Sequence, residues 1–363
     1  QISAITFMAR RITGRMIKYL GSKRTLIPRL LEVFGSGPKA PRVIVDLFSG
    51  TSRVGHACKK AGYRVLSNDH NSYAETLARC YVQADLGQHK DEAIRRIGLL
   101  MEVAPKPGYF TRTFCEESRF FTPENGARVD AMRDQIQAWS LAGELDAELE
   151  AILLVSLMEG ADRVDSTTGV QMAYLKAWAP RALKSIALRL PDVVPAATNG
   201  KCLAHCGEAV ETARLWADEA DLVYLDPPYN QHKYVGNYHI WETLVRWDAP
   251  EAYGVARKRV DCRERGSAFN SKPRIAAALA KVIDGALSGE RVKRLVTSFS
   301  DEGYLSRADI SGMLEPHGEL EVIEIDYKRY VGAQIGIHSP KGKRVGKPGV
   351  RRNTEYLFVL DRP

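Results

Sequence analysis

The chain has 363 residues, of which 45% are hydrophobic, so it can bury at least one large core. Its 52 basic and 44 acidic residues give a formal net charge of +8, which favours an anionic partner such as nucleic acid without deciding it. The six scattered cysteines exclude a disulfide framework and a paired zinc spacing, and no apolar run approaches the ~20 residues of a membrane span.

Six short segments rich in branched apolar residues predict the strands of a sheet. The first three are flanked by turn or helix signals, as expected of buried parallel strands. In chain order the six are residues 43–48, 65–68, 222–225, 294–299, 321–325 and 355–360. Because helical or loop segments separate them, we predict an α/β fold with a mostly parallel sheet. Ligands of such a sheet bind outside the carboxyl ends of the strands, where the strand order switches.

Strand signals stop between about residues 83 and 195. Leucine and isoleucine recur there at helical spacing, as between Leu149 and Leu157, and Pro191 with Pro195 closes the stretch. We therefore predict an all-helical insertion between two parts of one domain. The predicted parts are residues 1–85, the insertion 86–195 and residues 196–363, the last with basic loops at 248–274 and 341–352.

The first motif is VIVDLFSGTSRVG at residues 43–55, a strand that ends in an acid and is followed by a glycine turn and a helix start. Gly50 would let the backbone approach a ligand, and Asp46 could bind a cation or amine by a charge-assisted hydrogen bond. An ordinary strand-to-helix turn explains the same residues. Since Ser52 replaces the middle glycine of G-x-G-x-x-G and no G-K-[ST] is present, a ligand without phosphates is favoured.

The second motif, VLSNDHN, places Asp69 at the end of the second predicted strand. An acid at this position can accept hydrogen bonds from ribose hydroxyls. Alternatively, Asp69 or Asn71 is only the cap of the following helix. In combination with the first motif, the ribose interpretation predicts an adenosine-containing ligand.

The third motif is LVYLDPPYN at residues 222–230. Two successive prolines remove two backbone donors and keep the chain out of a helix, so Asp226 and nearby carbonyls are presented rigidly at the strand end. Asp226 and the carbonyl of Pro227 can accept both hydrogens of an exocyclic amine, while Tyr229 offers a face on which a planar base can stack. The alternative is a proline-rich turn after a strand.

These motifs resemble the Dam-like class of adenine-specific DNA methyltransferases, the DPPY type, which use S-adenosylmethionine. The order of that class is kept: IKYLGSK at 17–23, DLFSG at 46–50, SNDHN at 67–71, a helical insertion and DPPYN at 226–230. The likeness extends to SFSDEG at 298–303 and to the closing NTEYLFVL. It implies a Rossmann-like class I methyltransferase sheet, mostly parallel and of about seven strands, with a helical insertion domain for target recognition.

The resemblance also implies roles for individual residues. The catalytic segment that holds the target adenine would be Asp226, Pro227, Pro228 and Tyr229. The methionine end of the cofactor would contact Tyr19, Gly21 and Lys23, its sulfonium side Asp46, Phe48, Gly50 and Asp226, its ribose Asp69 and His70, and its adenine Glu208 and Ala209. Tyr19 departs from the family pattern, because a tryptophan often stands beside the cofactor there.

Duplex DNA is the implied partner, and members of the class flip the target adenine out of it. The predicted DNA-contacting residues are Lys233, Tyr234, Tyr238, Arg257, Lys258, Arg259, Arg263, Arg265, Lys343 and Arg344. An amphipathic helix beginning near Asn237 would explain Trp241 and Leu244 equally well. The insertion adds aromatic and basic residues, but many of its aromatics could belong to the core and its cations to phosphate contacts.

We therefore expect a cytoplasmic DNA N6-adenine methyltransferase without a metal ion, part of a restriction-modification system and accompanied by a cognate endonuclease. The same site would suit the exocyclic amine of cytosine, or adenine in RNA, although the acid at Asp226 favours adenine because the cytosine enzymes more often carry serine there. A non-catalytic nucleic-acid binding protein on a methyltransferase scaffold is the alternative from another class. A dinucleotide enzyme is disfavoured by the missing glycine series.

Overall fold

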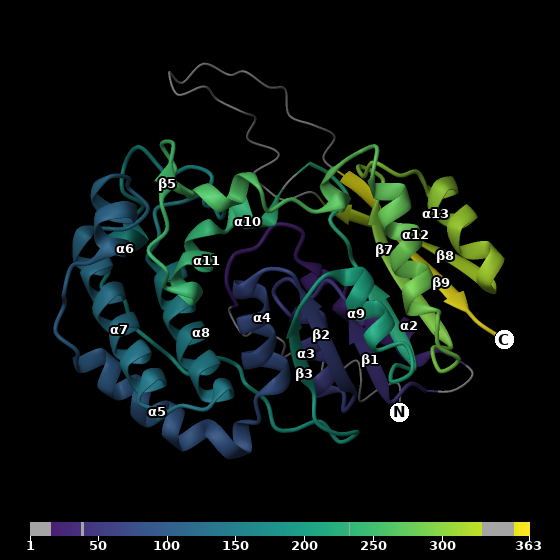
Figure 1. Ribbon diagram of the computed structural model, residues 1–363, viewed down its shortest axis with the longest axis horizontal. Coiled ribbons are helices and arrows are strands. Elements are labelled where there is room, and N and C mark those ends of the chain that lie inside the picture. Colours follow the sequence, from purple (N-terminus) through teal and green to yellow (C-terminus); the bar gives the residue numbers. More distant parts are fainter. Residues whose placement is uncertain (1–15, 38–39, 232, 329–351) are drawn as a thin grey trace.

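The computed structural model describes residues 16–37, 40–231, 233–328 and 352–363 (Figure 1). Seven strands form one sheet in the order β3-β2-β1-β4-β7-β9-β8. The strands are β1 (Val43–Asp46), β2 (Arg64–Asp69), β3 (Leu203–Cys206), β4 (Leu222–Leu225), β7 (Arg294–Ser300), β8 (Glu319–Lys328) and β9 (Arg352–Asp361). All neighbouring pairs from β3 to β7 are parallel, and β9 runs antiparallel to both β7 and β8. The predicted mostly parallel sheet of about seven strands is confirmed.

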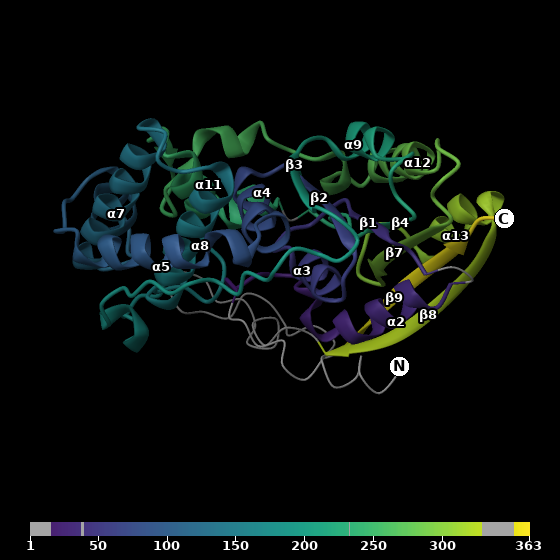
Figure 2. The ribbon, with the colours of Figure 1, turned by 90° about the horizontal axis from the view of Figure 1, so that it is seen from below.

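Helices cover both faces of the sheet, as the view from below shows (Figure 2). The α-helices are α2 (Ile27–Gly35), α3 (Arg53–Lys60), α4 (Ser72–Ala78), α5 (Leu86–Glu102), α6 (Tyr109–Thr111), α7 (Pro123–Leu141), α8 (Ala147–Arg163), α9 (Ala209–Leu215), α10 (Tyr234–Asn237), α11 (His239–Arg246), α12 (Ile275–Ala286) and α13 (Arg307–Leu314). Ile44 of β1 belongs to the core on the α2 and α3 side, whereas Val43 and Val45 belong to the core on the α9 and α12 side. Burial on both faces explains why this strand reads as a continuous apolar run.

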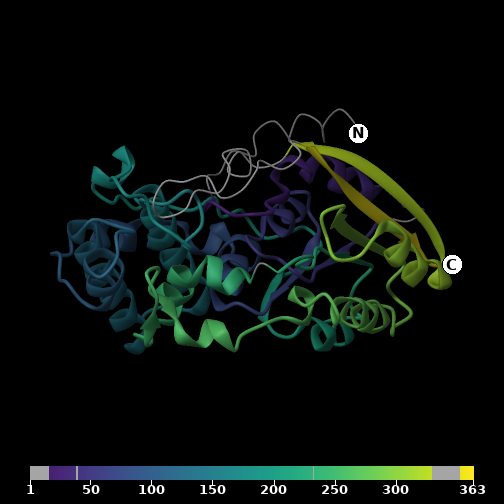
Figure 3. The same cartoon turned by 90° about the horizontal axis from the view of Figure 1, so that it is seen from above.

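The helices of the predicted insertion gather to one side of the sheet, at the left of Figure 1, and the view from above agrees (Figure 3). Helices α5, α7 and α8 carry most of this part. The expectation that the whole insertion is helical is wrong for residues 164–195, where only Pro180–Leu183 form a helical turn, of the 3-10 type. Prolines at 180, 191 and 195 remove backbone donors, which disfavours a continuous helix through this stretch, and Pro180 begins the one helical turn.

Strand β3 was not predicted from the sequence. Its residues Leu203–Cys206 lie at the edge of the sheet and are only half-buried or exposed, so they form no apolar run. The six predicted strands all lie in the sheet, and β8 and β9 are longer than expected. A two-stranded hairpin, β5 (Ala252–Tyr253) with β6 (Lys258–Arg259), interrupts the predicted loop 248–274.

The strand order switches at β1. The chain passes from β1 outward to β2 and β3, and then returns to β4 on the other side of β1. A crevice outside the carboxyl ends of β1 and β4 is the expected ligand site of such a sheet. Asp46 is the last residue of β1, and Asp226 follows the last residue of β4, so the switch brings the first and third motifs together.

Candidate active site

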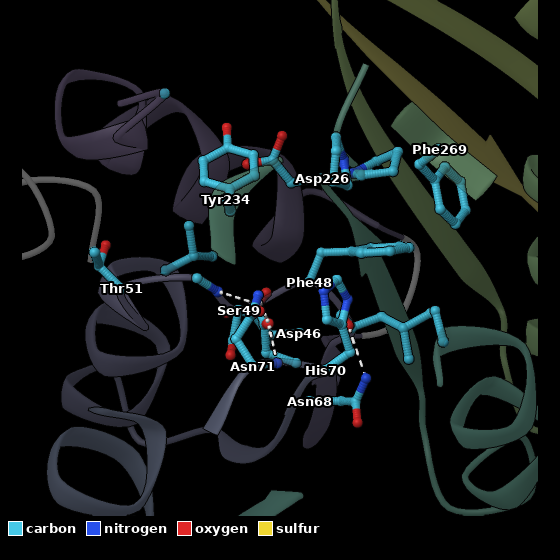
Figure 4. Close-up of a pocket in the computed structure, with 18 of the residues that line it drawn as sticks. Asp46, Phe48, Ser49, Thr51, Asn68, His70, Asn71, Asp226, Tyr234 and Phe269 are labelled. Carbon is cyan, nitrogen blue, oxygen red and sulfur yellow. Dashed lines mark hydrogen bonds between the residues drawn. The ribbon is translucent and has the colours of Figure 1, made fainter. Parts of the chain in front are cut away.

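A cavity of about 910 Å³, counting the part open to solvent, lies at this crevice (Figure 4). Its walls come from residues 19–23, from the ends of β1, β2 and β4, and from the turn before α9. All predicted cofactor and catalytic residues line it: Tyr19, Gly21, Lys23, Asp46, Phe48, Gly50, Asp69, His70, Glu208, Ala209, Asp226, Pro227, Pro228 and Tyr229. The structure thus brings the motifs into one site, while the role of each residue remains a prediction.

The glycine turn after β1 is held by hydrogen bonds to β2. Ser49 N donates to Asn68 O at 2.9 Å, and Gly50 N donates to the Asp69 carboxylate at 3.1 Å. Gly50 has a φ of 50°, and a Cβ there would come within 3.2 Å of the Tyr19 hydroxyl oxygen. A side chain at this position would therefore be strained and would crowd the cavity wall.

Asp46 and Asp69 supply acceptor oxygens from two adjacent strands. Asp46 is buried and accepts a hydrogen bond from Gly55 N at 3.2 Å, while its burial and the nearby charge of Asp226 raise its pKa to about 7. The other oxygen of Asp69 accepts from Asn71 N at 2.9 Å. Since Asn71 is the N-cap residue of α4, Asp69 is not the cap of that helix, although it braces the turn.

Lys23 and Asp226 form an ion pair inside the cavity wall. The Lys23 ammonium lies 2.9 Å from Asp226 Oδ1 and 2.6 Å from Glu355 Oε1. Burial raises the pKa of Asp226 to about 6, the charge of Lys23 counteracts this rise and the charge of Glu355 adds to it. Burial lowers the pKa of Lys23, but the two carboxylates outweigh burial and raise it well above its usual value.

Aromatic rings form the wall near Asp226. Tyr19, Tyr234 and Tyr238 form a group of roughly parallel rings, with Tyr19 at a centroid distance of 5.3 Å from Tyr234 and 4.6 Å from Tyr238. Tyr229 packs against Phe299 and has the Lys23 ammonium 5.7 Å from its ring centroid. Figure 4 shows Tyr234 at the same end of the cavity as Asp226. This end of the cavity combines an acid with flat rings, as a site for a planar amine requires.

Two residues predicted to contact DNA are buried, and these predictions are wrong. Tyr238 is 1% exposed, and its hydroxyl accepts a hydrogen bond from Leu20 N at 2.6 Å. Arg259 is also 1% exposed, with its guanidinium bound to Asp248 at 2.6 and 2.7 Å and to Asp261 at 3.0 Å. The amphipathic helix that explained this region equally well is present as α11.

The other residues predicted to contact DNA differ in their exposure and in whether an acidic side chain of the protein already pairs with them. Arg265 pairs with the buried Glu242 at 2.6 Å, and Arg257 pairs with Glu117. The remaining predictions, Lys233, Tyr234 and Lys258, are half-buried, and Arg263 is exposed. The Arg263 guanidinium lies 4.0 Å from the centroid of the Tyr253 ring. Lys343 and Arg344 lie outside the described residues.

Sequence reasoning missed several residues of the cavity. Arg53, the first residue of α3, lines it, and its Nε has no hydrogen-bond partner among the described residues. The hydroxyl of Ser49, which is 8% exposed, has none either. Phe269, from the predicted basic loop, packs on Phe48 with a centroid distance of 5.1 Å. Arg53 could have been found as the cation that directly follows the glycine turn at a helix N-terminus.

The family model of the D12 class N6 adenine-specific DNA methyltransferases matches residues 19–290. The chain belongs to this family. The match spans the cavity and the catalytic motif, and it confirms the predicted Dam-like class and its reaction type. Methyltransferases of this class take the methyl group from S-adenosylmethionine, so the predicted cofactor is confirmed for the family as well.

Type II methyltransferases are among the similar proteins. M.NlaIII from Neisseria lactamica is 27% identical over 359 residues, which cover 95% of this chain and 99% of that protein. M.FokI from Planomicrobium okeanokoites is 29% identical over 335 residues, or 86% of this chain. This chain spans only half the length of M.FokI. A solved structure, the SAM dependent methyltransferase from Agrobacterium tumefaciens, matches with a TM-score of 0.34 and 9% identity over 95% of this chain and 63% of that one.

The part of the chain that the structure describes contains neither a candidate membrane span nor a candidate metal cluster. Within residues 16–37, 40–231, 233–328 and 352–363, no helix combines the length and the apolar character needed to cross a bilayer. In the same ranges, no three histidine, cysteine or acidic side chains come together as ligands for a metal ion.

Proposed function

We propose that this chain transfers a methyl group from S-adenosylmethionine to N6 of an adenine flipped out of a specific duplex DNA sequence. The position of Asp226 carries the proposal: it follows β4 and shares one cavity with every predicted cofactor residue. The family match supports the reaction class. The methylation of cytosine or of RNA would need a similar amine site, but no feature of this cavity favours either.

The polar groups of the cavity fit the cofactor. Asp69 can accept hydrogen bonds from ribose hydroxyls, and Asp46 can accept one from the methionine ammonium. The methionine carboxylate needs donors, and the Arg53 side chain and the first amides of α3 offer them at the positive end of the helix dipole. Phe48 and Phe269 form an apolar wall for the adenine ring, and Glu208 also lines the cavity.

When bound, S-adenosylmethionine supplies an electrophilic methyl group, and the protein positions the amine that accepts it. Lys23 binds Oδ1 of Asp226, whereas Oδ2 has no partner among the described residues and can accept one hydrogen of N6. The Pro227 carbonyl can accept the other. These acceptors increase electron density on N6, and Asp226 receives the proton that N6 loses when its bond to carbon forms. Tyr229 and Tyr234 are the rings against which the adenine would stack.

The DNA contacts are proposed for Lys233, Lys258 and Arg263 outside the cavity and for Tyr234 in its wall, with the helical insertion as the target-recognition part. Arg257 and Arg265 would first have to leave their acidic partners. Because M.NlaIII and M.FokI are Type II methyltransferases, we place this chain in a restriction-modification system in the cytoplasm, with an endonuclease specific for the same site.

The test is methylation of DNA from a strain without adenine methylation, followed by nucleoside mass spectrometry and mapping of modified positions. We expect N6-methyladenine in one short sequence context. The variant Asp226→Asn should lose at least about 10²-fold in kcat, the usual size of a lost proton acceptor, while it binds S-adenosylmethionine in calorimetry with little change. Asp284→Asn makes the same chemical change at an exposed position of α12 and should remain fully active.

Two results would contradict the proposal. Methylcytosine as the sole product would assign the enzyme to the other amine. An Asp226→Asn variant with the activity of the unmodified chain would show that this carboxylate does not accept the proton of the amine. Loss of activity together with loss of cofactor binding in that variant would point to a structural role of Asp226 and would also contradict the assignment.

A further inference from the structure

Glu355 lies behind the proposed catalytic carboxylate. It is on β9, 3% exposed, and opposite Ser300 of β7 in the antiparallel register. Its Oε1 accepts a hydrogen bond from Lys23 Nζ at 2.6 Å across 332 positions of the chain. A buried carboxylate is costly unless it is paired, and Lys23 is the partner that the described structure provides.

The three charges form a short chain from Glu355 through Lys23 to Asp226. The Lys23 side chain is 7% exposed and that of Glu355 is 4% exposed, whereas Asp226 is 18% exposed at the cavity. One ammonium thus serves two carboxylates, and the cluster keeps a net negative charge when all three groups are ionised. That excess charge lies beside the cavity that accepts the base.

We propose that Glu355 is a positioning residue of the methyl transfer: it holds the Lys23 ammonium in place and shares its charge, so that Asp226 keeps one oxygen free and remains a strong acceptor. The proposal rests on the function proposed above for Asp226. Without Glu355, the Lys23 charge would be neutralised by Asp226 alone. A carboxylate that is more fully neutralised accepts hydrogen bonds less strongly, because acceptor strength follows basicity.

The charged groups around Asp226 predict how its pKa changes when Glu355 is replaced. The ionisable groups that interact with it are Lys23, Glu355 from β9, Asp46 from β1, Tyr224 from β4 and Tyr234 from α10, while the Tyr229 ring faces Lys23. The charge of Glu355 raises the pKa of Asp226, so its removal should lower that pKa. In the unmodified enzyme, kcat/KM should fall as the pH drops through about 6, where the Asp226 carboxylate takes up a proton.

The experiment compares Glu355→Gln, Glu355→Asp and Glu324→Gln in methylation of a duplex that contains the mapped site. Glu355→Gln keeps the side-chain shape and removes the charge. We expect kcat to fall about tenfold, the acid limb of kcat/KM to move about one pH unit lower, and the dissociation constant of S-adenosylmethionine to stay unchanged. Glu355→Asp keeps the charge, so its acid limb should stay near that of the unmodified enzyme, and part of the lost rate should return.

Glu324→Gln is the matched control, because Glu324 lies on the neighbouring strand β8 in an exposed ion pair with Arg307. It should leave the rate and the pH profile unchanged. An unshifted acid limb in Glu355→Gln, or an undiminished kcat, overturns the proposal. If Glu355→Gln does not fold, Glu355→Asp decides: a displaced acid limb in that variant contradicts a role that depends on charge.

The two proposals fail in different ways. If Asp226→Asn retains full activity, the assignment of Asp226 fails, and the role proposed for Glu355, which acts through Asp226, fails with it. If Asp226→Asn is inactive while Glu355→Gln behaves as the unmodified enzyme, only the role of Glu355 is refuted.

Discussion

The variant Lys23→Met tests the ion-pair cluster as a whole. Methionine has a similar length but no charge, so the change leaves Asp226 and Glu355 facing each other without the ammonium between them. The buried Glu355 and the half-buried Asp226 then repel each other, and both lose their contact with Lys23 Nζ. We expect loss of folding stability at pH 8 and loss of methyl transfer, because Asp226 is then favoured in its protonated form.

The expected loss of folding stability follows from how far the charged groups are removed from water. The pKa of Asp226 rises from 3.8 to about 6, which corresponds to about 3 kcal/mol that its ionisation already costs the folded state at pH 8. Removal of one partner of a buried ion pair costs about 3–5 kcal/mol more. An acid with a raised pKa contributes stability below its unfolded pKa, and that contribution is lost as the pH rises through the folded pKa. Without Lys23 this pKa rises further, so the cost should be largest near pH 8 and smaller near pH 5.

The assay is urea unfolding of the unmodified chain and of Lys23→Met at both pH values. Lys60→Met is the matched control: its ammonium pairs with Asp192 at 2.8 Å, but both side chains are substantially exposed, at 29% and 39%. A surface pair of this kind contributes about 0–1 kcal/mol. If Lys23→Met costs no more than Lys60→Met at pH 8, or costs the same at both pH values, then Lys23, Asp226 and Glu355 do not form a cluster of ionised groups removed from water.

Two further predictions concern arginines. Arg259→Ala removes a buried guanidinium that binds Asp248 and Asp261, and these partly exposed carboxylates then keep Arg246 as a close partner, so the protein should lose about 1–3 kcal/mol in urea unfolding. Arg263→Ala should leave stability unchanged and reduce the slope of log K for DNA against log salt by about one. Equal effects of the two substitutions on stability would contradict the burial difference. Arg53→Met should raise the dissociation constant of S-adenosylmethionine about tenfold in calorimetry but barely change that of decarboxylated S-adenosylmethionine; equal losses for both ligands would argue against a carboxylate contact.

The sequence by itself determined the strand-end motifs and their order. Asp46, Asp69 and Asp226 each stand at or just after the end of a short apolar segment. Such segments can be recognised in the sequence because strand formation depends on local composition and turn signals. Since parallel strands present their carboxyl ends at one edge, a single cavity could be expected without knowing the strand order. The half-exposed β3 and the irregular residues 164–195 lacked a clear periodic signal, and there the local reasoning failed.

Only the tertiary structure decided which charges are available. Arg259 and Arg263 look alike in the sequence, yet one is enclosed between two carboxylates and the other is exposed. Lys23 and Glu355 are nearly the whole chain apart, and their contact exists because β9 inserts between β7 and β8. Sequence patterns record the charge and polarity of each residue, but pairing and burial depend on neighbours that only the completed sheet brings into contact.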